Sequence, residues 1–424
     1  MIEWSESDLM IRDAIRQFVD KEIRPHLDAL ESGELPPYNI IRKMFAAFGI
    51  DTMAAQSTAK QLARRRAREA AKAAGEPEPA RSERSGGSGG SDGPGGSGRE
   101  SMAAILSSEL AGVSLGLVSS IGVSLGLTAA TISAKGTLAQ QERWLPKLAT
   151  FEQVGAWAIT EPDSGSDAFG GMKSYVRRDG EDYILNGQKT FITNGPYADV
   201  IVVFAKLDEG ATDVPKRDRK VLTFVLDKGM PGLTQGKPFK KMGMMSSPTG
   251  ELFFDNVRLG RDRLLGEQEP AAGDSKDAVR TGFTMERIGI AALALGIINE
   301  CHRLCIEYAK SRTLWGQEIG RFQLIQLKLA KMEIARINVQ NMVFAGIEKQ
   351  RAGKTISLAE ASAMKLYSSE AATDVAMEAV QLFGGNGYMA EYRVEQLARD
   401  AKSLMIYAGS NEIQVTHIAK ALLA

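Results

Sequence analysis

Two segments, 156–167 and 185–195, hold the residues whose types and spacing are most suggestive of chemistry. Each reads as an apolar strand that closes on an aromatic residue, an apolar residue and Thr before a turn. The first closes on Trp157 and Thr160, and the second on Phe191 and Thr193. Two such strands can line a pocket with one aromatic face and one hydroxyl each, which suits a flat heterocycle with polar edges. The alternative is a pair of ordinary strands with Thr in β-favourable positions.

Two further clusters interrupt helical patterns. Residues 311–316 combine Arg312, Trp315 and a glycine, and Arg312 suits a phosphate because its guanidinium presents several donors in a fixed plane. Residues 381–388 contain the adjacent glycines Gly384 and Gly385, which let a backbone approach a ligand without interference from Cβ. A surface Arg on a helix-terminal turn remains the alternative for Arg312 alone.

Two carboxylates in the C-terminal half differ in their sequence surroundings. Glu286 precedes Arg287 in a stretch rich in Ile, Ala, Leu and Gly, and Glu412 follows a Gly-Ser turn. A carboxylate in apolar surroundings has a raised pKa, which makes it more basic. For Glu286, a surface ion pair with Arg287 is the alternative reading.

The elements that must position these residues form three blocks. Apolar residues recur at helical spacing up to about residue 148, alternate as in strands from 154 to about 265, and return to helical spacing from about 277. We expect an α+β multidomain protein with an N-terminal helical domain at 1–153, a β-barrel or sandwich domain at 154–270 and a C-terminal four-helix bundle at 271–424. The basic, Ala-rich run 60–72 reads as a solvated helix that leads into a linker, with binding of an anionic partner as the alternative. Together with the Gly- and Ser-rich residues 85–98, which should form a flexible coil, it gives a flexible insertion at about 57–101.

Composition narrows the function classes. The chain has 424 residues and zero formal net charge, which favours neither nucleic acid nor an anionic membrane as main partner. Cys301 and Cys305 are expected to be buried small residues, and no cluster has metal-ligand spacing. The apolar stretch 110–134 is rich in Gly and Ser, which favours packed helices over a membrane span. A polar, acidic N-terminus predicts a cytoplasmic enzyme, and the missing Gly-x-Gly-x-x-Gly argues against a Rossmann site.

The order of the four clusters resembles the acyl-CoA dehydrogenase family from about Ala103 to the C-terminus. The resemblance implies FAD held between the β block and the C-terminal helices. Trp157 and Phe191 would lie near the ring system, Thr160 and Thr193 would donate to its polar edge, and Ser166 would lie toward the pyrophosphate. The implied cofactor contacts are Trp157, Ile159, Thr160, Ser166, Phe191, Thr193, Arg312, Trp315, Gln323, Gln381, Gly384, Gly385, Ser410 and Glu412.

The resemblance also implies an assembly and a reaction. The clusters around Arg312 and Gly384 would contact the FAD of a neighbouring subunit, in a homotetramer built as a dimer of dimers. The reaction would be α,β-dehydrogenation of an acyl-CoA thioester to the trans-2-enoyl-CoA, in which a carboxylate removes the α-proton and a hydride moves from the β-carbon to flavin N5. Electrons would leave through an electron-transferring flavoprotein.

The base has to be reassigned in this chain. Many family members carry it in a Tyr-Glu-Gly-Thr sequence, and here Ala408 stands where that Glu would be. The isovaleryl-CoA and long-chain branches place Glu on an earlier helix instead, and Glu286 matches that position. Glu412 is the competing carboxylate. The implied substrate contacts are Ser166, Arg287, Tyr407, Ala408 and Gly409, with the main-chain N–H of Ala408 available to the thioester carbonyl.

Two other functions stay open at the level of the sequence. An acyl-CoA oxidase-like flavoenzyme would use the same scaffold and differ in how oxygen reaches the reduced flavin. A non-catalytic homologue that binds FAD or acyl-CoA would account for Ala408 and for the insertion, which departs from the family pattern. Acyl chain length is not set by the sequence, because the relocated Glu is shared by branched short-chain and long straight-chain enzymes.

Overall fold

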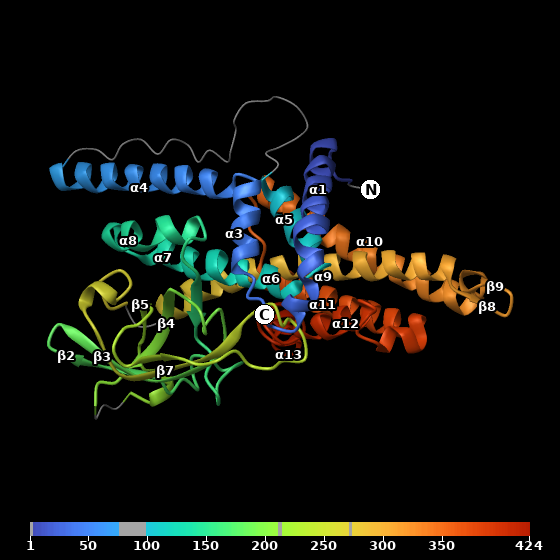
Figure 1. Cartoon of the computed structure of the whole chain (residues 1–424). Helices are drawn as coiled ribbons and strands as arrows, with labels where there is room; N and C mark the ends of the chain where they lie inside the picture. Colours follow the sequence, from blue (N-terminus) through green and yellow to red (C-terminus); the bar gives the residue numbers. More distant parts are fainter. Residues whose placement is uncertain (1–2, 76–98, 211–213, 271–273) are drawn as a thin grey trace.

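The computed structural model describes residues 3–75, 99–210, 214–270 and 274–424. The chain forms an N-terminal set of helices, a β domain and a C-terminal set of helices, in the predicted order. Figure 1 shows the first set across the top, the β domain at the lower left and the C-terminal helices through the centre and right. The predicted fold class is therefore confirmed.

The first and the last of the N-terminal helices begin with side-chain caps. Ser5 and Asp8 exchange side-chain and backbone hydrogen bonds of 3.2 Å at the start of the first helix, and Thr137 with Gln140 does the same at the last. These pairs satisfy N–H groups that a helix start leaves without partners. The helices are α1 (Glu6–Phe18), α2 (Leu27–Glu31), α3 (Tyr38–Ala47), α4 (Ile50–Ala74), α5 (Arg99–Ala111), α6 (Leu115–Ile121), α7 (Ala130–Lys135) and α8 (Leu138–Ala149).

Part of the expected insertion is ordered helix. Residues 57–74 lie in α4, which packs along α8 through the ion pair of Arg66 with Glu142 and reaches α7 through a 2.9 Å hydrogen bond from Gln61 to Ser133. The basic run is therefore helical, as its reading as a solvated helix predicts, and the flexible insertion was set to begin too early at residue 57, because Ala, Arg and Lys are good helix formers and α8 provides partners. Residues 99–101 belong to α5, and the Gly- and Ser-rich residues 76–98 lie outside the described residues.

Between α6 and α7 the helix widens into a π-helix, η3 (Gly122–Ala129). This segment packs on the first strand of the β domain. The N–H of Gly155 donates to Ser124 Oγ at 2.9 Å, and a Cβ built on Gly155 would lie 2.7 Å from Thr128 Cβ. Gly155 is therefore required by the close approach of strand and helix, and π-helical turns of this kind often accompany functional sites.

The β domain is one curled seven-stranded sheet with the order β1-β4-β2-β3-β7-β6, and β5 pairs with β4. β1 and β2 run parallel to β4, and the other pairs are antiparallel. Every residue of β4 is buried, including Lys206, as the apolar run 200–205 predicts for most of the strand. The strands are β1 (Gly155–Ala158), β2 (Tyr175–Asp179), β3 (Asp182–Thr193), β4 (Val200–Leu207), β5 (Val221–Asp227), β6 (Leu233–Gln235) and β7 (Thr249–Leu259).

A buried ion pair joins the end of β1 to β3. Lys189 Nζ lies 2.8 Å from Glu161 Oε1, and both side chains are almost fully buried. Glu161 also accepts the backbone N–H groups of Lys173 and Ser174, so its charge is well solvated by the protein. Burial acts to raise the pKa of Glu161, but Lys189 and these donors outweigh it and the pKa stays below its usual value.

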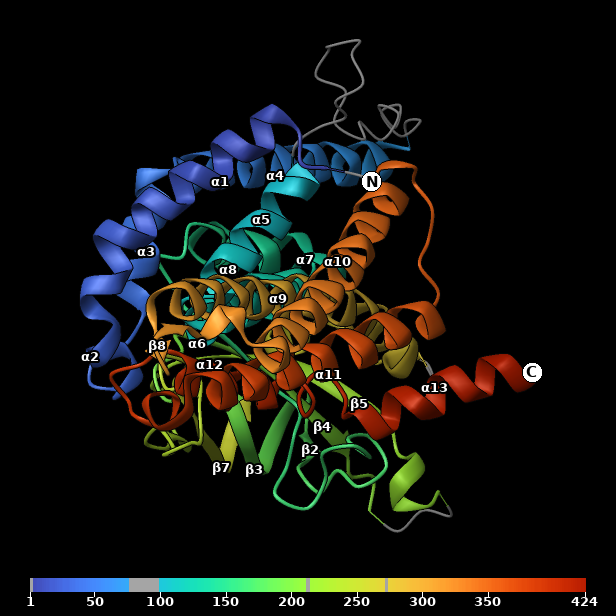
Figure 2. The same cartoon turned by 90° about the vertical axis from the view of Figure 1, so that its right-hand side faces the viewer.

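The C-terminal helices surround α9, which runs through the middle of the molecule (Figure 2). α9 crosses α5 at close range, since a Cβ built on Gly296 would lie 2.1 Å from the carbonyl oxygen of Ser108. Cys301 and Cys305 are free and buried in this core, as predicted. The helices are α9 (Asp274–Ser311), α10 (Gln323–Arg351), α11 (Leu358–Phe383), α12 (Val394–Ser403) and α13 (Asn411–Leu423), and the short strands β8 (Thr313–Leu314) and β9 (Gln317–Glu318) form a hairpin between α9 and α10.

Two helical stretches are long and apolar enough, by length and composition alone, to cross a membrane. They are Leu115–Lys135 and Glu286–Ser311, and 50% and 61% of their most apolar windows are buried inside the protein. Both stretches pack against other elements of the core, as interior helices of a folded domain do.

The ion pair between β1 and β3 gives a test of the β domain. Lys189→Met should lower the free energy of unfolding by about 3 kcal/mol, because it leaves the Glu161 carboxylate buried without its cation. Changing both residues, Glu161→Leu with Lys189→Met, should cost clearly less than the sum of the single changes. Urea unfolding followed by circular dichroism measures both.

Lys173→Met is the matched control, because its ion pair with Asp163 is largely exposed and should contribute less than about 1 kcal/mol. Equal losses in Lys189→Met and Lys173→Met would show that the buried pair contributes no more than a surface one.

Candidate active site

The structure brings the first two predicted clusters together. The ends of β1 and β3 lie side by side, with the N–H of Thr190 donating to the carbonyl of Thr160 at 2.9 Å. Phe191 is 67% exposed and has a positive φ of 56°, so the strand turns its ring outward at this point. Thr160 and Thr193 are half-buried beside it. One aromatic face and two hydroxyls are therefore presented at a single edge.

The other predicted residues of this edge differ in how far they can reach a ligand. Trp157 is half-buried, with its indole N–H 3.2 Å from Thr131 Oγ1 and its ring edge-on to Phe204 at 4.9 Å. The side chain of Ile159 is buried in the apolar core, so only its main chain can face a ligand. Ser166 is exposed on the turn after β1.

Asn194 holds this edge against the N-terminal helices, and the sequence analysis missed it. Its amide donates to the carbonyls of Ser120 at 3.0 Å and Gly155 at 2.9 Å, and it accepts from the Tyr38 hydroxyl at 3.2 Å. Its φ is 64°, a left-handed value that Asn tolerates better than most residues. The Asn-Gly pair that follows β3 was the available signal.

The third and fourth clusters also come together, at the far end of the C-terminal helices. Tyr308 on α9 stacks on Phe383 at 4.0 Å and accepts from the Asn386 amide at 3.0 Å. The N–H of Arg312 donates to the Tyr308 carbonyl at 2.9 Å, so the hairpin that carries Arg312 lies next to the glycine turn. Trp315 on this hairpin is 87% exposed, with its ring edge-on to Phe322.

Around this hairpin the predicted contact residues are open to solvent. Arg312, Gln323 and Gln381 are exposed, and a Cβ built on Gly384 or Gly385 would meet no atom within 4 Å. Figure 1 places the β8–β9 hairpin at the opposite end of the molecule from the β domain. One small ligand cannot reach both ends of the same chain.

Glu286 lies on α9 and is half-buried between the C-terminal helices and the turn at 404–410. Burial raises the pKa of Glu286 to about 7, and the cations of Arg287 and Lys365 oppose that shift. A carboxylate with its pKa near neutrality is ionised when needed and still basic enough to take a proton from carbon.

The turn at 404–410 presents its backbone to the same region. Ala408 has a φ of 56° and Gly409 a φ of 82°, so two consecutive residues are left-handed and the peptide groups are turned out of the helical direction. Arg287 Nε lies 3.5 Å from the Ala408 carbonyl, and Gln414 Nε2 donates to the Gly409 carbonyl at 2.7 Å. Within the described part of the chain the Ala408 N–H has no hydrogen-bond partner, which leaves it available to a ligand.

Lys365 completes this site and was not predicted. Its ammonium is fully buried on α11 and donates to Asn411 Oδ1 at 2.7 Å. Burial lowers the pKa of Lys365 to about 8, and neighbouring carboxylates including Glu286 oppose this. A Lys inside a stripe of Ser and Ala on a buried helix was the signal that sequence reasoning could have used.

Glu412, the competing carboxylate, is exposed at the start of α13. Its own backbone N–H and the Ser410 hydroxyl hold the pKa of Glu412 below its usual value. A weakly basic, solvated carboxylate is a poor proton acceptor for a carbon acid. Glu286 is therefore the more buried and the more basic of the two carboxylates.

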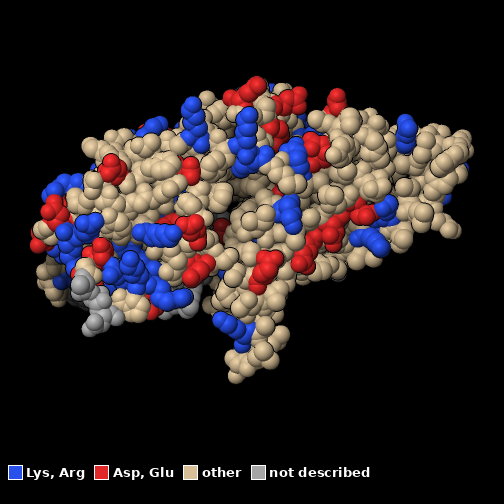
Figure 3. All heavy atoms as spheres, turned by 90° about the horizontal axis from the view of Figure 1, so that it is seen from below, with Lys and Arg blue, Asp and Glu red and all other residues tan. Residues whose placement is uncertain are grey.

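Several buried side-chain atoms have no hydrogen-bond partner in the described chain. Two of them, Arg287 Nη1 and Gln414 Oε1, belong to side chains that contact the turn at 404–410. Buried polar groups are normally paired, so these two atoms indicate a place where a polar ligand or water completes the bonding. Figure 3 shows the surface hollowed where the β domain at the left meets the helices at the right.

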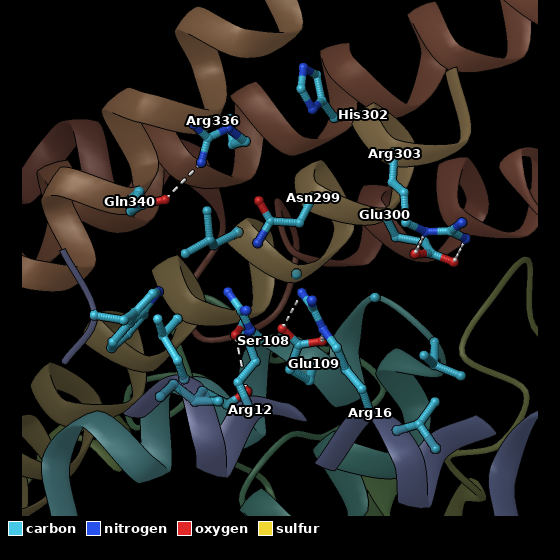
Figure 4. Close-up of a pocket in the computed structure, with 18 of the residues that line it drawn as sticks. Arg12, Arg16, Ser108, Glu109, Asn299, Glu300, His302, Arg303, Arg336 and Gln340 are labelled. Carbon is cyan, nitrogen blue, oxygen red and sulfur yellow. Dashed lines mark hydrogen bonds and ion pairs between the residues drawn. The ribbon is translucent and has the colours of Figure 1, made fainter. Parts of the chain in front are cut away.

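A separate cavity of about 940 Å³ lies between α1, α5, α9 and α10 (Figure 4). Its arginines are committed to carboxylates: Arg16 to Glu109 at 2.8 Å, and Arg303 to Glu300 at 2.9 Å. It contains none of the predicted site residues, so its size alone does not make it the active site. Among the residues described, no group of three or more His, Cys, Asp and Glu could hold a metal ion.

Comparison with known proteins identifies the scaffold. Three family profiles match: acyl-CoA dehydrogenase N-terminal domain at 52–152, middle domain at 156–257 and C-terminal domain at 276–423. An acyl-CoA dehydrogenase of Bacillus subtilis (strain 168) is 34% identical over 423 residues, which is 99% of this chain and 98% of that protein.

The chain belongs to the acyl-CoA dehydrogenase family.

Solved structures agree with this assignment. Butyryl-CoA dehydrogenase from Megasphaera elsdenii superposes with a TM-score of 0.81 at 30% identity, covering 100% of both chains. A glutaryl-CoA dehydrogenase from Mycobacterium smegmatis in complex with FADH2 gives a TM-score of 0.76 at 27% identity, covering 99% of this chain and 95% of that one. The protein is thus a flavoprotein oxidoreductase of fatty acid metabolism with FAD as cofactor, and it dehydrogenates an acyl-CoA thioester.

The residues present fit FAD. The exposed ring of Phe191 and the hydroxyls of Thr160 and Thr193 suit a flat ring with polar edges, while Arg312 and the uncovered glycine turn suit a pyrophosphate. These two groups lie at opposite ends of one chain, so an extended cofactor can meet both only if two chains contribute.

Burial of Glu286 predicts a pH-dependent stability. Between its ordinary carboxyl pKa of 4.5 and its raised pKa of about 7, the unfolded chain releases the proton and the folded chain keeps it. The folded state therefore loses stability as the pH rises through this window. Glu286→Gln has no proton to release, so it should be more stable than the wild type by about 2 kcal/mol near pH 8 and equal near pH 4.

Urea unfolding at a series of pH values measures this difference. Glu412→Gln is the control and should show no such gain, because its carboxylate is exposed. A Glu286→Gln variant that is no more stable than the wild type near pH 8 would mean that Glu286 is not held in a desolvated site.

Proposed function

We propose that Glu286 is the base that removes the α-proton of the acyl-CoA, as in the isovaleryl-CoA and long-chain branches that the sequence resembles. Three observations support it. Ala408 has no side chain that can accept a proton, burial raises the pKa of Glu286 to about 7, and Glu412 is exposed with a lowered pKa. The raised pKa of Glu286 is the observation that carries the proposal.

The turn at 404–410 holds the thioester carbonyl in this proposal. The Ala408 N–H donates to the carbonyl oxygen as negative charge develops there, and its left-handed conformation is maintained by Arg287 and Gln414 on the flanking carbonyls. Tyr407 and Gly409 shape the same end of the site, and Ser166 lies at its outer side. Bound FAD supplies the acceptor for the β-hydride.

The remaining contacts would orient the cofactor. Trp157, Phe191, Thr160 and Thr193 face its ring system from the β domain, with the main chain of Ile159, while Ser410 and Glu412 approach it from the C-terminal turn. Arg312, Trp315, Gln323, Gln381, Gly384 and Gly385 hold the FAD of a neighbouring subunit. The hairpin that carries Arg312 lies far from the β domain of its own chain, which supports contact with the FAD of a neighbouring subunit.

A cofactor that is contacted by two chains implies an oligomer. We propose a homotetramer, a dimer of dimers, in which α10 contributes to the subunit contacts. Leu324, Leu327 and Ile334 on α10 are 74%, 51% and 59% exposed, which is unusual for large apolar side chains on a helix unless another surface covers them.

The electron acceptor is proposed to be an electron-transferring flavoprotein in the cytoplasm. A solved structure described as the electron-transferring flavoprotein of Acidaminococcus fermentans superposes on 100% of this chain with a TM-score of 0.77. An oxidase-like reaction would instead return the electrons to oxygen, so the rate of reoxidation by air separates the two.

Anaerobic bleaching of the bound flavin by acyl-CoA tests the base. The wild type should be bleached, with kcat/KM rising as the pH passes through about 7 because Glu286 must be ionised. Glu286→Gln should lose at least about 10³-fold in the bleaching rate, whereas Glu412→Gln should keep it within about ten-fold. Normal bleaching by Glu286→Gln would refute the assignment, and a wild type that no acyl-CoA bleaches would indicate a non-catalytic homologue.

Retention of FAD tests the contribution of the second subunit. Arg312→Ala should weaken FAD binding about ten-fold or more, since it removes a charged donor to the pyrophosphate, and should raise the fraction of colourless protein after gel filtration. Arg321→Ala, an exposed Arg a few residues further along, is the control and should keep its flavin. Equal flavin content in both variants and the wild type would contradict a role for Arg312.

A further inference from the structure

The surface of α4 carries a row of cations that no carboxylate of the described chain neutralises. Lys60, Arg64, Arg68 and Lys72 recur every four residues, so each lies beside the next along the helix surface. All four side chains are exposed, and none of them forms an ion pair within the described part of the chain. Together these four residues form the basic row.

The other two cations of the same stretch are paired, which sets the basic row apart. Arg65 Nε lies 3.1 Å from Glu69 Oε1, and Arg66 forms its ion pair with Glu142 on α8. Like charges four residues apart on a helix repel each other. The basic row therefore weakens its own helix unless an anion from outside the chain approaches it.

α4 lies at the edge of the molecule, where a large partner can reach it. Figure 1 shows it along the top of the N-terminal helices, above α7 and α8. From Lys60 to Lys72 the row is about 18 Å long, at a rise of about 1.5 Å per residue. The chain as a whole has zero formal net charge, and salt screens charges beyond about 10 Å. Attraction of an anionic partner is therefore local to this helix.

We propose that the basic row docks the enzyme on a membrane surface rich in anionic phospholipids. Anionic headgroups diffuse in the plane of the bilayer, so they can gather under a fixed row of cations without a matched shape. Clusters of four or more Lys and Arg on a helix are typical of proteins that charge holds at such surfaces. The substrate class suits this location, because acyl-CoAs are amphiphiles whose longer members partition into bilayers.

The surface around the row lacks the features that other anionic partners use. The exposed side chains between the cations include Ala63, Ala67 and Ala70, and α4 contains no aromatic residue. The core of a specific protein interface is enriched in aromatic residues and Met, and single-stranded nucleic acid is bound by stacking on aromatic rings. A surface of Lys, Arg and Ala offers charge alone, which favours lipid headgroups over an acidic protein or a single strand.

Cosedimentation of the full-length holoenzyme with lipid vesicles tests the proposal. At about 0.05 M salt the wild type should bind vesicles of mixed phosphatidylcholine and phosphatidylglycerol at least about 100-fold more tightly than vesicles of phosphatidylcholine alone, and it should be released at about 0.5 M salt. Changing the whole row to Gln (Lys60→Gln, Arg64→Gln, Arg68→Gln and Lys72→Gln) should lower that affinity about 100-fold or more, because each cation near an anionic surface contributes roughly five-fold.

The matched control removes four exposed cations elsewhere on the chain, through Lys21→Gln, Lys228→Gln, Lys237→Gln and Lys354→Gln. It has the same net charge as the row variant and should keep the wild-type affinity within about five-fold. FAD content and Tm should be equal in all forms, since Gln is about as good a helix former as Lys or Arg.

Two smaller changes on the row keep the test independent of folding. Arg64→Lys with Arg68→Lys retains the charge and should bind like the wild type. Arg64→Gln with Arg68→Gln replaces the fourfold variant if that variant unfolds, and should lower the affinity about 25-fold.

The proposal is overturned if the wild type binds both kinds of vesicle equally, if the row variants keep their affinity, or if the control loses as much as the fourfold row variant. It is also overturned if a short DNA duplex or a single-stranded RNA, at the same phosphate concentration, binds through the row more tightly than the anionic vesicles do. The row would then serve a nucleic acid.

Discussion

The partial removal of Glu286 from water is the constraint on which the rest of the site depends. A carboxylate in solvent is too weak a base for a carbon acid, and one buried without compensation would stay protonated. Here burial raises the pKa of Glu286, while Arg287 and Lys365 limit the rise to about 7. The helices that provide this burial are α9 and α11, and the close crossing of α9 with α5 at Gly296 keeps α9 at the centre of the fold.

Arg287 connects the proposed base to the proposed carbonyl site. It follows Glu286 on α9 and reaches the carbonyl of Ala408, so it also supports the left-handed turn at Ala408 and Gly409. On the other side, the buried pair of Glu161 with Lys189 joins the end of β1 to β3, and the amide of Asn194 bonds to Gly155 on β1 and to Ser120 on α6. Buried polar contacts therefore hold the elements of the proposed site in place and exclude water from between them.

The sequence predicted the features that local patterns encode. The three blocks, the paired strand ends at Thr160 and Thr193, and the glycine turn at Gly384 follow from periodicity and turn chemistry, and resemblance supplied the family and its cofactor. Lys365, Asn194 and the partnership of Glu161 with Lys189 were not predicted, because each depends on contacts between residues far apart in the chain. The extent of α4 was misjudged for the same reason: its partner α8 lies beyond the insertion. Burial of a single carboxylate can only be seen once all surrounding helices are placed.

The central claim is that Glu286 itself moves the α-proton. Exchange of that proton with deuterium, followed by NMR on an acyl-CoA analogue that can lose its α-proton but cannot transfer a hydride, measures this step alone. The account predicts rapid exchange by the holoenzyme and by Glu412→Gln, and exchange slowed to the uncatalysed rate by Glu286→Gln, with FAD content equal in all three. Rapid exchange by Glu286→Gln, or loss of exchange in Glu412→Gln alone, would contradict it.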